Sequence, residues 1–97
     1  MKITAFKPVE FNFWNDGIQY VYEFPNRGIR VSVILTPYSY GGKKGYWEMG
    51  IFQYGELAYE NDITGYDAVR GWLTWEEVQN NLKKIEERGL QPYVDVV

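Results

Sequence analysis

The chain has 97 residues, 45% of them hydrophobic and 24% charged, and its net charge is −3. This length and composition predict one folded domain over residues 1–97 and argue against a disordered chain or a membrane-spanning segment. The complete lack of histidine and cysteine removes disulfides, most zinc sites and most familiar catalytic groups, and the small net charge argues against a nucleic-acid partner.

The N-terminal residues show only weak strand signals. Lys2–Phe6 could form a strand, and Pro8–Asp16 carries Val9, Phe11 and Phe13 at alternate positions. Alternation of this kind is typical of a strand, but it does not say which neighbour the strand pairs with. The pairing of this whole N-terminal part therefore stays open.

Two stronger strands follow and predict a β-hairpin. In Gly17–Phe24, large apolar or aromatic residues at the even positions alternate with smaller or polar residues at the odd positions. Ile29–Thr36 is rich in β-branched residues. Pro25–Gly28 lies between them, with a proline that presets φ and a glycine that accepts a positive φ. The three segments together indicate strand, turn and strand.

A glycine-rich loop leads to the next two strands. Gly41–Gly45 is followed by an aromatic and aliphatic stretch, Tyr46–Gln53, which we expect to be a third strand. Gly50 inside that stretch indicates a bulge or the close approach of another backbone. Glu56–Tyr59 is expected to form a short fourth strand.

One helix is predicted from signals at both of its ends. Thr74 followed by Glu77 is a capping box, which places the first helical residue after Thr74. Gly89 suits the position after the helix and Pro92 bars its continuation, so the predicted helix covers Trp75–Arg88. Its apolar residues recur at helical spacing and form one face. These are Trp75, Val78, Leu82 and Ile85.

These elements predict an α+β fold. We expect an antiparallel sheet of four to five strands with one C-terminal amphipathic helix packed across one face. The tail Tyr93–Val97 alternates again and could add an edge strand. The first residues, Met1–Thr4, lack the apolar run of a secretory signal, so a cytoplasmic location is expected.

Two polar clusters invite a ligand interpretation, and a simpler one is favoured for both. Gly41–Gly45 lacks the spacing and the following helix of a phosphate-binding P-loop, which favours a hairpin connection with two solvated lysines over anion binding. The acids before the helix lack the pattern of a calcium-binding loop, so we expect solvated loop acids rather than a metal or catalytic site. These acids are Glu56, Glu60, Asp62 and Asp67. No cofactor is expected.

The aromatic residues are abundant, with four tryptophans, nine tyrosines and five phenylalanines, and they separate into two groups. Periodicity assigns one group to the core. Its members are Tyr20, Tyr22, Phe24, Trp47 and Trp75. The other group lies in turns or at element ends, where aromatic side chains either cap the core or contact a partner. Its members are Tyr38, Tyr40, Tyr54, Tyr59, Tyr66 and Trp72.

The predicted binding surface is the glycine-rich loop with its flanking tyrosines. Tyr38, Tyr40 and Tyr46 flank two lysines, Lys43 and Lys44, whose charges can steer an acidic partner. Aromatic and cationic side chains are also typical of binding hot spots. We expect the glycines to leave this loop mobile, so that it matters to binding and little to folding. The alternative surface consists of three other aromatics, Tyr59, Tyr66 and Trp72.

Three consecutive motifs occupy the C-terminal half, Tyr46–Ile85. An aromatic-Glu-aliphatic strand at Tyr46–Ile51 is followed by a Tyr-Asp-Ile-Thr-like turn at Tyr59–Thr64 and a Val-x-Gly-aromatic-Leu-Thr-x-Glu-Glu-Val helix start at Val69–Val78. In these motifs the chain resembles small uncharacterised proteins of tailed bacteriophages and prophages of Gram-positive bacteria. The resemblance implies a phage origin and brings no activity or site residue with it.

Composition and resemblance together predict a non-enzymatic phage accessory protein that binds and inhibits a host protein inside the bacterial cell, for instance as an anti-CRISPR-type inhibitor of host defence. The alternative is an oligomeric small-molecule binder that sequesters a nucleotide signal through its aromatics and the loop with Lys43 and Lys44. A homo-oligomer is compatible with either function, and an enzyme ranks third.

Overall fold

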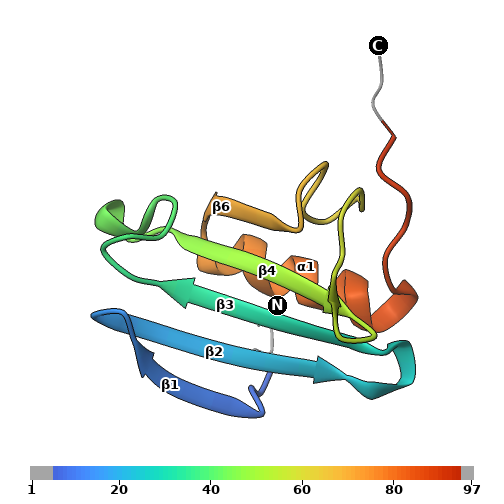
Figure 1. Cartoon of the computed structure of the whole chain (residues 1–97), viewed down its shortest axis with the longest axis horizontal. Helices are drawn as coiled ribbons and strands as arrows, with labels where there is room; N and C mark the ends of the chain where they lie inside the picture. Colours follow the sequence, from blue (N-terminus) through green and yellow to red (C-terminus); the bar gives the residue numbers. More distant parts are fainter. Residues whose placement is uncertain (1–5, 95–97) are drawn as a thin grey trace.

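The computed structural model of the chain describes residues 6–94 and consists of an antiparallel sheet with one helix against it (Figure 1). In these residues the sheet has six strands: β1 (Glu10–Trp14), β2 (Gly17–Phe24), β3 (Ile29–Leu35), β4 (Trp47–Gln53), β5 (Glu56–Leu57) and β6 (Val69–Leu73). Neighbours follow the order β1-β2-β3-β4-β5, and β6 also pairs with β4. The predicted α+β class is confirmed, with one strand more than expected.

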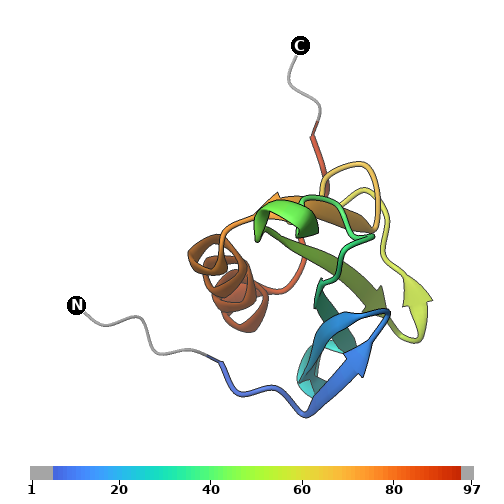
Figure 2. The ribbon, with the colours of Figure 1, turned by 90° about the vertical axis from the view of Figure 1, so that its left-hand side faces the viewer.

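The helix and the sheet form two layers. Figure 2 shows α1 (Trp75–Arg88) to one side of the sheet, and the helix contacts β4 and β6. Buried side chains from both layers and from the connection between β5 and β6 form the hydrophobic core: Tyr22, Ile29, Val31, Val33, Met49, Ile51, Ile63, Leu73, Val78, Leu82 and Ile85. No helix within residues 6–94 has the length and apolarity needed to cross a membrane.

The N-terminal strand β1 pairs with β2, which resolves the pairing that alternation left open. The chain reverses through Asn15 and Asp16, whose φ angles are 47° and 60°. A two-residue type I′ turn requires positive φ at both positions, and asparagine and aspartate tolerate it better than most residues. The turn therefore aligns Trp14 with Gly17 and fixes the register of the hairpin.

The middle of the sheet follows the predicted strands closely. β2 has the predicted bounds, and a short 3-10 turn, η1 (Pro25–Arg27), connects it to β3. β3 ends at Leu35 and β4 begins at Trp47, each one residue inside its expected range. β5 stops at Leu57, two residues before the expected Tyr59, because β6 occupies the rest of that edge of β4.

The strand β6 was not predicted, since Arg70 and Gly71 interrupt its apolar pattern. Gly71 and Trp72 together oppose Glu48 of β4, so the irregularity in this pairing is a β-bulge, and Trp72 has a positive φ of 59°. We expected a bulge or a close backbone approach at Gly50, but the bulge lies at Gly71 and Trp72 of the neighbouring strand. A Cβ at Gly50 would lie in ordinary contact with a neighbouring side chain, at 3.7 Å.

The helix α1 begins and ends at the predicted residues. Thr74 Oγ1 accepts from the N–H of Glu77 at 3.1 Å, and Glu77 Oε1 accepts from the N–H of Thr74 at 2.9 Å. These bonds hold the pKa of the Glu77 carboxyl below its ordinary value. At the other end the N–H of Gly89 donates to the carbonyl of Ile85 at 2.9 Å.

Two predicted edge strands fall largely outside the described residues. Of Lys2–Phe6 only Phe6 is described, and its N–H donates to Gln79 Oε1 at 2.8 Å. Of Tyr93–Val97 only the first two residues are described, and neither belongs to a strand.

Candidate binding surface

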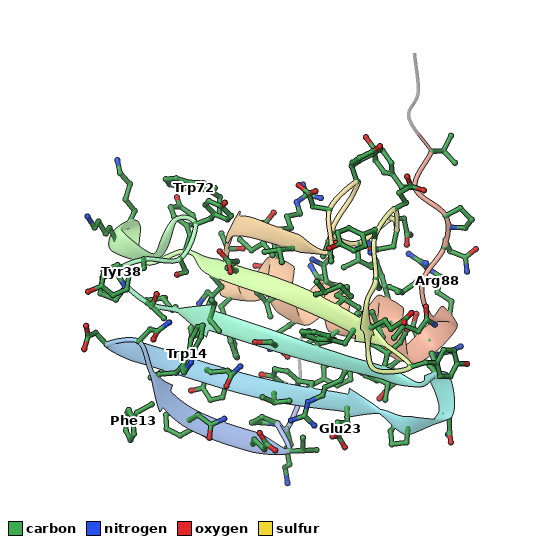
Figure 3. All side chains as sticks on the ribbon, viewed as in Figure 1. Phe13, Trp14, Glu23, Tyr38, Trp72 and Arg88 are labelled. Atoms are coloured by element: carbon green, nitrogen blue, oxygen red, sulfur yellow. The ribbon has the colours of Figure 1, made fainter. Side chains whose placement is uncertain are left out.

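Exposed aromatic side chains gather toward one end of the sheet. Figure 3 labels four of them there: Phe13, Trp14, Tyr38 and Trp72. Antiparallel pairing brings together three segments at this end, namely the β1–β2 turn, the β3–β4 connection and the bulged end of β6. The predicted binding loop is the β3–β4 connection, and its Tyr38 and Tyr40 are 73% and 65% exposed.

A buried threonine organises the first half of this loop. Thr36 is 2% exposed, and its Oγ1 accepts the N–H groups of Tyr38 at 3.1 Å and of Ser39 at 3.0 Å. The Ser39 hydroxyl donates back to the carbonyl of Thr36 and accepts its N–H, both at 3.0 Å. This network leads into a 3-10 turn, η2 (Gly42–Lys44), which carries both lysines.

Two glycines allow close backbone packing at this loop, Gly42 within the loop and Gly71 in the neighbouring strand β6. A Cβ on Gly42 would lie 1.8 Å from the carbonyl oxygen of Thr36, and a Cβ on Gly71 would lie 2.2 Å from Cβ of Tyr40. Neither site can hold a larger residue unless the backbone moves. Gly42 and Gly71 thus serve close packing, and the mobility expected from the glycines of this loop stays a prediction.

Trp72 belongs to the same surface as the loop. The backbone N–H of Trp72 donates to the carbonyl of Tyr40 at 3.1 Å. The backbone N–H of Tyr40 in turn donates to Glu48 Oε1 at 2.9 Å. The Trp72 ring also lies 5.8 Å from the ring of Tyr46. We define the loop cluster as Tyr38, Tyr40, Lys43, Lys44, Tyr46 and Trp72.

The alternative surface expected from the sequence is thus divided. Trp72 joins the loop cluster, whereas Tyr66 packs against Tyr93 with their ring centres 6.5 Å apart. Tyr59 is exposed and pairs with neither. The signal that ties Trp72 to the loop is the preceding Gly71, because a missing side chain permits another segment to approach.

The loop cluster combines apolar rings with donors and positive charge. Tyr38 donates its hydroxyl to Asp16 Oδ2 at 3.3 Å, while Lys43 and Lys44 are exposed and form no ion pair within residues 6–94. A hollow of about 320 Å³ lies beside the lysines. Its lining residues are Pro37, Ser39, Tyr40, Gly41, Lys43, Lys44 and Trp72. This arrangement suits binding of acidic or aromatic groups.

One of the acidic residues before the helix, Asp62, has a structural partner. The Asp62 carboxylate accepts from Arg88 Nη2 at 2.5 Å and from the N–H of Gln91 at 3.0 Å. Partial burial opposes ionisation, but these bonds outweigh it and lower the pKa of Asp62 below its ordinary value. Across the described part of the chain, no three carboxylate, histidine or cysteine side chains come together as a possible metal site.

A second aromatic feature runs along the helix side of the sheet. The ring of Tyr20 lies 5.1 Å from Phe11, 5.8 Å from Trp47 and 5.7 Å from Trp75. Phe11 in turn lies 5.3 Å from Phe13. Trp75, predicted in the core, is 37% exposed, because it stands at the start of the helix with other rings on only part of its surface.

Comparisons with known proteins give no relative: no protein-family model, no curated protein and no solved structure matches the chain. The resemblance to phage proteins stays a prediction. A functional proposal therefore depends on the surface chemistry of the chain and on that resemblance.

Proposed function

We propose that this chain is a non-enzymatic phage accessory protein that binds a bacterial host protein through the loop cluster and inhibits it. The observation that carries the proposal is a loop fixed by hydrogen bonds that presents large aromatic side chains to solvent. Tyr38 and Tyr40 are mostly exposed, so the folded chain gains little from burying them. Their rings become buried only when a partner covers them.

The fixed loop favours binding. Thr36, Ser39 and Glu48 hold its backbone before any partner arrives, so little conformational entropy is lost on association. Tyrosine and tryptophan add large contact area with few rotatable bonds. Both properties suit a protein that works by occupying a surface.

The charge of the loop cluster indicates the chemistry of the partner. Lys43 and Lys44 place two positive charges at one end of a chain whose net charge is −3. Complementary charges speed association and orient the partners. We therefore expect the bound surface of the host protein to be acidic and to contain apolar recesses for the rings.

The phage and anti-defence parts of the proposal rest on the resemblance of Tyr46–Ile85 to phage proteins. A stoichiometric inhibitor of a host defence protein, such as a CRISPR effector, needs an interface and no catalytic group. The absence of histidine and cysteine from the sequence is compatible with that way of acting. Its place of action would be the cytoplasm of the host bacterium.

One observation favours a second candidate function. The 320 Å³ hollow beside Lys43 and Lys44 has the Trp72 side chain in its wall. An aromatic ring and two ammonium groups are the chemistry that a nucleotide base and its phosphates require. Sequestration of a nucleotide signal is therefore the alternative to binding a host protein.

The experiment compares two quadruple alanine variants. The cluster variant changes Tyr38, Tyr40, Lys43 and Lys44, and the matched control changes two exposed tyrosines and two exposed lysines elsewhere. The control residues are Tyr54, Tyr59, Lys83 and Lys84. Affinity capture from host lysate identifies the partner, and titration with the purified partner gives the affinity of each variant.

We expect the cluster variant to melt at nearly the parent temperature and to bind the partner at least tenfold more weakly, equivalent to about 1.4 kcal/mol. The control should bind like the parent. Undiminished affinity in a folded cluster variant would contradict the proposal. Release of a nucleotide on denaturing the purified chain, with no captured protein, would favour the alternative.

A further inference from the structure

Strand β1 is an open sheet edge with large apolar side chains. All five of its residues are exposed, and Phe11, Phe13 and Trp14 are exposed by 48%, 85% and 45%. Its only strand partner in the described residues is β2. Edge strands are usually protected by charged side chains, especially lysine, by proline or by a bulge. Glu10–Trp14 has one charged residue, Glu10, which pairs with Arg30 at 3.1 Å, and it contains no lysine or proline.

The turn geometry determines which backbone groups of β1 are free. A two-residue hairpin turn makes Trp14 and Gly17 a hydrogen-bonded pair. Because such pairs alternate along an antiparallel ladder, Asn12 also directs its N–H and C=O toward β2. Phe11 and Phe13 direct theirs away from β2, toward the open edge.

We propose that this edge pairs with the same edge of a second copy of the chain, in antiparallel orientation, with the two-fold axis at Asn12. In this register Phe11 of each copy lies opposite Phe13 of the other. Each of these pairs exchanges two backbone hydrogen bonds. All outward N–H and C=O groups of Phe11 and Phe13 are then satisfied in both copies.

Other registers use the edge less completely. Moving the axis to Phe11 places Phe13 opposite Val9, whose N–H already donates to the carbonyl of Val21 at 2.7 Å. Moving the axis to Phe13 places Phe11 opposite Asn15, which lies in the turn. The register centred on Asn12 is therefore the one that pairs all the outward backbone groups of Phe11 and Phe13.

The side chains fit this register on both faces of the sheet. On the helix side, Phe11 and Phe13 already pack edge to face at 5.3 Å, so two copies create a cluster of four rings. On the other face Asn12 meets Asn12 of the second copy, and Glu10 lies opposite Trp14 of the second copy. No like charges face each other.

The accessible area predicts a weak dimer. A buried aromatic side chain covers about 150–250 Å², so the exposed parts of Phe11, Phe13 and Trp14 offer roughly 350 Å² in each copy. The two copies together contribute about 700 Å² from these rings. This area lies below the roughly 1,200 Å² at which specific, stable interfaces begin, so we expect the dimer to be weak.

Single cysteines test the register, because the natural sequence contains no cysteine. Two copies of Asn12→Cys would have Cα atoms about 4.5 Å apart, which a disulfide can bridge. Glu10→Cys is the matched control on the same face, since four residue steps separate its two copies by roughly 13 Å. We expect mild oxidation to give much more covalent dimer with Asn12→Cys, and equal yields would overturn the register.

Sedimentation equilibrium tests the dimer itself. The parent should pass from monomer to dimer as its concentration rises, and Phe13→Lys should weaken this dimer at least tenfold by placing charge on the edge. Tyr54→Lys changes a residue that is 80% exposed and lies outside β1, and it should dimerise like the parent. A parent that stays monomeric at its highest soluble concentration, or a dimer unaffected by Phe13→Lys, would overturn the proposal.

The two proposals fail separately. The cluster variant leaves all of Glu10–Trp14 unchanged, so it should dimerise with the parent affinity even if it no longer binds a host protein. Conversely, Phe13→Lys leaves every loop-cluster side chain in place.

Discussion

At the scale of single residues, the loop between β5 and β6 depends on a buried amide. Asn61 is 3% exposed, and its Nδ2 donates to the carbonyl of Ala58 at 2.8 Å and to Thr64 Oγ1 at 2.9 Å. Its Oδ1 accepts the N–H groups of Ile63 and Thr64 at 2.9 Å and 2.8 Å. All four of its hydrogen-bonding positions are therefore occupied. The sequence drew attention to the acids around Asn61 and gave no comparable signal for the amide.

Replacing this amide by a carboxylate should be costly. In Asn61→Asp the new oxygen cannot donate to Ala58 or Thr64 when ionised, so we expect a loss of about 1–3 kcal/mol in the free energy of unfolding at pH 7. Urea titration measures this difference. Asn80→Asp makes the same change at an exposed helix position and should stay within about 0.5 kcal/mol of the parent. Equal stability of the two variants would contradict the role of Asn61.

At the scale of elements, the sequence predicted most accurately the helix and strand ends that depend on residues close together in the chain. The bounds of α1 follow from contacts between residues three or four positions apart, such as Thr74 and Glu77, and both ends were predicted correctly. The strand β6 has no local signal, because its place depends on β4 and on the approach of Tyr40. The strand β1 was predicted in part. Its alternating residues indicated a strand, but its pairing with β2 depends on the turn at Asn15 and Asp16.

The packing of α1 on the sheet gives the element-scale prediction. Leu82 is 0% exposed and belongs to the core, so Leu82→Ala should lower the free energy of unfolding by about 2–5 kcal/mol. Leu57→Ala removes the same atoms from a side chain that is 44% exposed, and it should lose about 1 kcal/mol or less. Urea titration of both variants checks the difference. Unfolding of Leu82→Ala at the parent midpoint would show that this helix face is not core.

At the scale of the whole molecule, every residue of the loop cluster except Trp72 was predicted from the sequence as part of the binding loop. Tyr38 and Tyr40 were selected because they lie in a loop, where periodicity gives no folding reason for an aromatic residue, and Tyr46 was selected because it flanks that loop. Trp72 belongs with them because β6 pairs with β4 and because its backbone N–H donates to the carbonyl of Tyr40. The one sequence signal for this approach is Gly71, and it does not identify the segment that approaches. The open edge of β1 was missed for the same reason, because an edge is defined by the strand order of the complete sheet.

Contacts between distant parts of the chain also connect the helix to the loops around it. Arg27 of η1 donates from Nη2 to the carbonyl of Glu86 at 2.9 Å, and Arg88 pairs with Asp62. The N–H of Gln91 donates to the same carboxylate, so the segment after α1 is held to the loop before β6. The ionisation state of Asp62 therefore affects how the end of the helix is held to the rest of the molecule.

This contact predicts a pH dependence of stability. The pKa of Asp62 is lower in the folded chain than its ordinary value of 3.8, so the ionised carboxylate stabilises the fold. That stabilisation is fully present above the unfolded pKa and is lost as the pH falls through the folded pKa. Asp62→Asn should therefore unfold at lower urea than the parent at pH 7, and the two should converge in acid.

Asp67→Asn provides the matched control for this experiment, since Asp67 is exposed in the same loop and forms no ion pair within residues 6–94. It should keep the parent midpoint in urea at pH 7. A difference between Asp62→Asn and the parent that stays constant from neutral to acid pH would mean that the ionised carboxylate is not what stabilises this contact. The end of α1 would then be held by its other contacts, including the bond from Arg27 to the carbonyl of Glu86.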